Sequence, residues 1–98
     1  MEIDNILEIG IDNVGRLYIK PEKEKFSMIY RLANEVHWDN NGSFLYSPKP
    51  REWSYFDWFK HMILVINIEC GVTLNVKPDT IWTSIHEPLK TEILNFVR

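Results

Sequence analysis

The chain has 98 residues, of which 45% are hydrophobic and 26% are charged, a balance that is typical of a folded globular protein and excludes a disordered chain. Its formal net charge of −3 argues against nucleic acid as a partner, because such proteins carry a basic surface. The longest apolar run, Met62–Ile66, is far shorter than the roughly 20 residues of a membrane span.

We therefore expect one cytoplasmic domain over residues 1–98. Cys70 is the only cysteine, so no intramolecular disulfide can form, which suits a reducing compartment. The acidic start, Met1-Glu2-Ile3-Asp4, lacks the basic and apolar pattern of a signal peptide.

The first element that the sequence predicts is a β-hairpin. Apolar and polar residues alternate over 6–11 and again over 16–20, and residues 12–15 between them are turn formers. Pro21 ends the second strand, because proline has no N–H for the sheet. Residues 22–31 show apolar residues at helical spacing but could also form a strand, and we predict a short helix there.

A second hairpin is indicated by the sequence Asn40-Asn41-Gly42. Alternating segments flank it, at 35–39 and 43–47. Asn-Gly favours a type I′ turn, which needs positive φ at both central residues. Two prolines, Pro48 and Pro50, then forbid regular structure and predict a loop.

A long helix is predicted from Tyr55 to Cys70. Ser54 is a typical N-cap, and Asp57 three residues later completes a capping box. Gly71 has the conformational freedom that the residue after a helix needs. The helix is so rich in apolar residues that we expect it to be largely buried, with Cys70 on its apolar stripe as a core residue.

A third hairpin is predicted from alternation over 72–77 and 81–85, with Pro78-Asp79 as its turn. A final helix follows from Pro88. The fold class predicted is therefore α+β: a mostly antiparallel sheet from three β-hairpins, with the long buried helix and the C-terminal helix packed on one face.

Aromatic residues form the most unusual feature of the sequence. Eight of the thirteen fall between Trp38 and Phe59, more than one strand face and one helix stripe can bury. They either form a recognition surface or fill the seam between hairpin and helix. Trp82 alternates with Ile81 and Thr83, so we expect it to point away from the core. The binding residues predicted on this basis are Trp53, Tyr55, Trp82, Arg51 and Tyr18.

Histidines and carboxylates suggest an alternative site. His37 and Asp39 share a strand face, and Asp57 and His61 share a helix face. Together in a cleft between sheet and long helix they could bind a small molecule or perform acid–base chemistry. Each pair is equally compatible with a plain polar surface. The spacings supply no recognised metal-ligand set, and we expect neither a metal nor a cofactor.

The chain is small, acidic, rich in aromatic residues and without a catalytic motif. In this character it resembles bacterial accessory proteins such as toxin-immunity partners and mobile-cassette products. The sequence favours a non-enzymatic binding protein whose partner is another protein or a second copy of itself. A small-molecule-binding or catalytic domain is the alternative.

Overall fold

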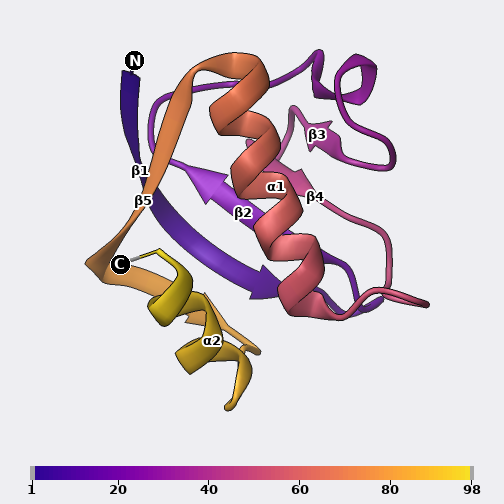
Figure 1. Cartoon of the computed structure of the whole chain (residues 1–98), viewed down its shortest axis with the longest axis vertical. Helices are drawn as coiled ribbons and strands as arrows, with labels where there is room; N and C mark the ends of the chain where they lie inside the picture. The colour runs from indigo at the N-terminus through magenta and orange to yellow at the C-terminus, as the bar shows by residue number, and fades with distance from the viewer. Residues whose placement is uncertain (1, 98) are drawn as a thin grey trace.

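The computed structural model describes residues 2–97 and shows a mixed α+β fold (Figure 1). Its elements, in chain order, are β1 (Glu2–Ile11), β2 (Leu17–Pro21), the short 3-10 helix η1 (Ile29–Arg31), β3 (His37–Asp39), β4 (Phe44–Tyr46), α1 (Tyr55–Cys70), β5 (Val72–Thr83) and α2 (Leu89–Phe96).

The five strands form one sheet in the order β3-β4-β2-β1-β5. Antiparallel pairing joins β1 to β2, β2 to β4 and β3 to β4. In contrast, β5 pairs in parallel with β1, and the two run side by side in Figure 1. The sheet is therefore partly parallel, and the prediction of three hairpins is wrong in its third member.

Residues 72–83 form one continuous strand instead of that hairpin. The register between β1 and β5 shifts at Ile6/Glu8, so the stretch containing Pro78 and Asp79 is an irregularity within the strand. Thr80 stabilises it, because its buried hydroxyl donates to the Ile6 carbonyl at 2.7 Å and accepts from the Lys77 N–H at 2.8 Å. A Pro-Asp pair is a local turn signal, and here pairing with a distant strand overrides it.

The helix predicted over residues 22–31 is also wrong, apart from the single turn of η1. The carboxylate of Asp4, which is only 1% exposed, accepts hydrogen bonds from the backbone N–H groups of Lys23 and Glu24. These bonds tie the segment to β1, and residues 22–28 form bends, turns and irregular backbone instead of a helix.

The long helix α1 is confirmed from its first residue to its last. Ser54 and Asp57 form the reciprocal capping box, and Gly71 ends the helix in the left-handed conformation with φ 69°. Trp58, Phe59, Met62 and Ile66 are its buried residues. They pack on the inward residues of β1 and β2 to form the core.

The turn between β3 and β4 has a different chemistry from the predicted type I′ turn. Ser43, with φ 57°, takes the left-handed conformation. The Asp39 carboxylate accepts from the N–H groups of Asn41 and Gly42, at 3.0 and 3.4 Å. The hairpin is therefore confirmed, but hydrogen bonds to the Asp39 carboxylate organise its turn in place of the predicted type I′ geometry.

Both α-helices lie on the same side of the sheet, where α1 crosses the strands and α2 lies near its lower end (Figure 1). The register shift places Trp82 opposite the buried Ile9, and Ile81 opposite Glu8. Trp82 therefore packs against the core on the helix side, while Ile81 is 59% exposed. The prediction that Trp82 points away from the core is wrong. Within residues 2–97, no helix combines the length and apolarity that crossing a membrane requires.

Candidate binding site

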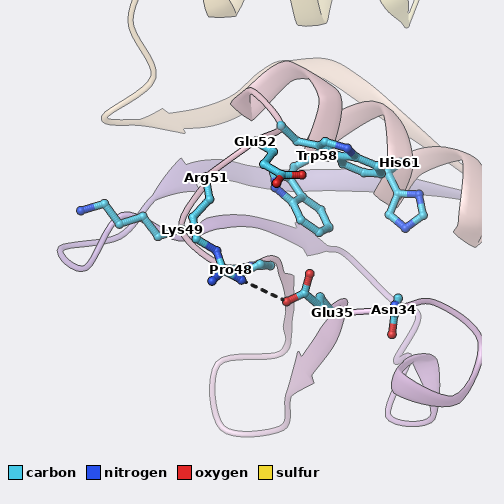
Figure 2. A pocket seen from close by; sticks show the side chains of 9 residues that line it. Asn34, Glu35, Pro48, Lys49, Arg51, Glu52, Trp58 and His61 are labelled. Carbon is cyan, nitrogen blue, oxygen red and sulfur yellow. Dashed lines mark ion pairs between the residues drawn. The ribbon is translucent and has the colours of Figure 1, made fainter.

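A pocket lies where two loops meet the start of α1. The loop after η1 contributes Asn34 and Glu35, the loop before α1 contributes residues 48–49 and 51–53, and α1 itself contributes Trp58 and His61. Its volume is about 520 Å³, which lies within the range of small-molecule sites. Segments far apart in the sequence therefore build this pocket (Figure 2).

Three rings form the aromatic wall of the pocket. The ring centroids of Trp53 and Trp58 are 4.8 Å apart, and His61 lies 5.3 Å from Trp53 and 5.9 Å from Trp58. Trp58 is 8% exposed and fixed by the core, whereas Trp53 is 44% exposed. One indole thus anchors the wall, and the other presents a large accessible surface.

Charged side chains surround the aromatic wall. The Arg51 guanidinium lies 3.8 Å from the Glu35 carboxylate, and these side chains are 82% and 51% exposed. A pair this long and this exposed contributes little to stability. Figure 2 shows the Glu35 carboxylate directed at Arg51, while Lys49 extends away from the pocket, and Glu52 also lines the pocket.

The pocket joins residues from both sequence-based hypotheses. Trp53 and Arg51 come from the predicted recognition surface, and His61 comes from the predicted small-molecule site. Trp58 and Glu35 are functional candidates that sequence reasoning missed. Trp58 has the helical spacing of a core residue, and Glu35 reaches the pocket only through tertiary folding.

Of the other members of the predicted polar site, only Asp57 stays near His61, about one turn earlier on α1. His37 and Asp39 pair with Tyr46 and Phe44, on the sheet face opposite α1. Asp57 caps α1, and hydrogen bonding with the Ser54 N–H and side chain holds the pKa of its carboxyl below the usual range. Over residues 2–97, no group of three or more His, Cys, Asp or Glu side chains could hold a metal ion.

Two predicted binding residues have structural contacts. The Tyr55 hydroxyl donates to the Gly15 carbonyl at 2.9 Å, which fastens the first turn of α1 to the β1–β2 turn. Trp82 lies under the ammonium group of Lys90, 5.2 Å from its ring centroid. Each is half-buried and packs against the core.

The sheet face without a helix carries a second aromatic surface, which we call the open-face cluster: Tyr18, Phe44 and Tyr46. Their ring centroids are 5.3 Å apart for Tyr18–Phe44 and 6.0 Å apart for Phe44–Tyr46. The Arg16 guanidinium lies 4.6 Å from the Tyr46 centroid. All three rings are half-buried, so contacts with neighbouring side chains hold them in place on this face.

A carboxylate stands beside the open-face cluster. Glu8 accepts hydrogen bonds from the Thr83 and Tyr18 hydroxyls, each at 2.6 Å. These bonds, that from Thr83 foremost, hold the pKa of the Glu8 carboxyl below its usual value. Burial and the same carboxylate raise the pKa of Tyr18. Glu8 is therefore an ionised acceptor that links β1 to both of its neighbouring strands.

Comparison with known proteins places the chain in a family. The family described as Integron Cassette Protein Hfx_Cass5 matches residues 4–80. A solved structure, described as an integron cassette protein from the mobile metagenome of the North West Arm Sewage Outfall, is 36% identical. That match covers 97% of this chain and 95% of the other, with a TM-score of 0.51.

Comparison with the curated proteins gave no match. The family match confirms the resemblance to mobile-cassette products that the sequence suggested. The chain belongs to the integron cassette protein family Hfx_Cass5.

Proposed function

We propose that this integron cassette protein is a non-enzymatic, cytoplasmic binding protein, and that its ligand enters the pocket between Trp53, Trp58 and His61. The observation that supports the proposal is the convergence of three rings on one pocket, with Trp53 left 44% exposed. Tryptophan in a pocket gives a large rigid contact area with little loss of conformational entropy.

The polar groups of the pocket support binding more than catalysis. His61 contacts two indole rings, and the carboxylate nearest along its helix, Asp57, is engaged with Ser54 and Lys60. General acid–base chemistry needs a titrating group held by an orienting partner. The ligand is a small molecule or a side chain of a partner protein that fills the same volume.

The test is native mass spectrometry on the protein gently purified from its source cells. The proposal expects a bound species on the wild type that is lost in Trp53→Ala. Tyr30→Ala is the matched control, because Tyr30 is also an exposed aromatic residue, at 54% against 44% for Trp53, and lies outside the pocket. A species that Trp53→Ala retains would show that the pocket is not the site. A bare wild type that no compound of a broad metabolite panel stabilises against heat would refute the function.

A second candidate function is self-association through the open-face cluster. Two copies related by a twofold axis must present self-complementary surfaces. This face carries charges of both signs around its rings: Arg16 lies over Tyr46, and Lys20 is opposite Glu8 in the sheet register. Such a mixture of charges fits a second copy of the chain better than a partner whose surface carries charge of one sign only.

Analytical ultracentrifugation tests this second candidate. The wild type is expected to dimerise at micromolar concentration, and Tyr46→Lys to be monomeric because it places a charge among the rings. Tyr30→Lys, on a different surface, should leave the dimer intact. A wild type that stays monomeric at high micromolar concentration would rule out the open-face dimer.

A further inference from the structure

The indole rings of Trp53 and Trp58 form an aromatic wall of the pocket on which no described cationic side chain stacks. Elsewhere in residues 2–97, cationic groups lie over four other aromatic rings: Arg16 over Tyr46, Arg31 over Tyr30, Lys60 over Phe56 and Lys90 over Trp82. No described cation stacks on Trp53 or Trp58, although Arg51 and Lys49 also line the pocket. Indole is the ring that attracts cations most strongly.

The orientation of the charges explains why the wall is free. Arg51 turns to Glu35, and Lys49 extends outward (Figure 2). Glu35 and Glu52 are exposed residues that also line the pocket, so two carboxylates at its rim can meet a positive charge. Since the Arg51–Glu35 contact is 3.8 Å long and exposed, an incoming cation can replace Arg51 at Glu35 with little loss.

We propose that the ligand of this pocket carries an organic ammonium group, which stacks on Trp53 and Trp58 while Glu35 and Glu52 balance its charge. The inference rests on the proposed function, because it assigns a chemical class to the occupant of the same pocket. The ammonium group belongs either to a free small molecule or to a lysine side chain of a partner protein. Both share this recognition chemistry.

The experiment compares probes that share a trimethyl-substituted head group and differ in charge. Choline is titrated against neohexyl alcohol, its neutral isostere with carbon in place of nitrogen, and against pivalate as the anionic counterpart. Isothermal titration calorimetry should give choline an affinity about tenfold above that of the alcohol. A blocked peptide with one lysine separates the two sources: tighter binding than choline identifies a protein-borne ammonium, and weaker binding identifies a free one.

Variants separate the contributions of rings and charges. Glu35→Gln and Glu52→Gln should each weaken choline binding by about threefold, with higher salt reducing that difference. Glu69→Gln removes the same charge from α1 outside the pocket and should have no effect. Trp53→Leu keeps an apolar side chain and should lose most of the preference for choline over the alcohol.

Three results would overturn the proposal. Equal binding of choline and the alcohol, both lost in Trp53→Ala, would leave the binding function intact and refute the cationic class. Tightest binding of pivalate would assign the pocket to anions held by Arg51 and Lys49. Absence of binding by all three probes and by the peptide would also refute the ammonium class, and the native mass measurement would then decide the function separately.

Discussion

The buried carboxylate of Asp4 should be the most important polar group for stability. It is 1% exposed and accepts from the N–H groups of Lys23 and Glu24, at 3.1 and 2.8 Å. In Asp4→Ala these two groups lose their acceptor, at about 1–3 kcal/mol each. A total near 3 kcal/mol is a large share of a small domain's stability and lowers the melting temperature by about 12–24 °C.

Thermal unfolding followed by circular dichroism measures this effect. Asp4→Asn keeps one oxygen acceptor and should fall between the wild type and Asp4→Ala. Asp79→Ala removes an exposed carboxylate from β5 and should leave the melting temperature nearly unchanged. If Asp4→Ala melts within a few degrees of the wild type, water satisfies these N–H groups equally well and the reasoning fails.

Three further outcomes are expected. Thr83→Val removes a donor to Glu8, so carboxyl-resolved NMR titration should show the Glu8 pKa rising. Because the pKa of Glu8 is lowered in the folded state, the stabilisation that its carboxylate provides is present above the usual glutamate pKa and is lost as the pH falls through the folded-state pKa. A Thr83→Val variant with an unchanged Glu8 titration would contradict the assignment. Ser54→Ala deletes half of the capping box and should reduce the free energy of unfolding by about 1 kcal/mol in urea titration, whereas no change would mean that the cap is redundant. Burial, and then the charge of Glu69, raise the pKa of the Cys70 thiol, so Cys70 should react with a thiol reagent near neutral pH more slowly than free cysteine; an equal rate would show an accessible, ordinary thiol.

The elements that sequence reasoning predicted well are those specified locally. Ser54, Asp57 and Gly71 lie within or next to α1, and each acts through contacts a few residues away. The β1–β2 turn, where the Asp12 carboxylate accepts from the Val14 N–H, and the β3–β4 turn, where the Asp39 carboxylate accepts from the Asn41 N–H, are local in the same sense. Their positions could therefore be inferred from spacing and turn chemistry alone.

The errors have non-local causes. The Asp4 carboxylate accepts from the N–H groups of residues about twenty positions away, a tertiary contact made by the irregular segment where a helix was predicted. Thr80 donates to Ile6 across the sheet, which converts a predicted turn into strand and reverses the side to which Trp82 points. No local pattern at these positions carries that information.

The difference between local and non-local signals also decides which parts of the candidate site could be predicted. Trp53 and Arg51 could be predicted as partly exposed because they flank a helix start next to a Pro-rich loop. Their grouping with Glu35 and His61 depends on how the loop after η1 packs against α1. Sequence spacing placed His61 with Asp57, His37 and Asp39, whereas the fold keeps only Asp57 on the same helix as His61 and places His37 and Asp39 in β3.

The pocket beside Trp53 and Trp58 is proposed to be where this protein binds its ligand. The most direct test is an NMR titration that follows the four indole N–H signals of the ¹⁵N-labelled protein, first with choline and then with the metabolite panel. Binding in this pocket predicts that the signals of Trp53 and Trp58 shift together and saturate, while those of Trp38 and Trp82, outside the pocket, stay in place. Saturable shifts confined to Trp38 or Trp82, or no saturable shift with any compound, would contradict it.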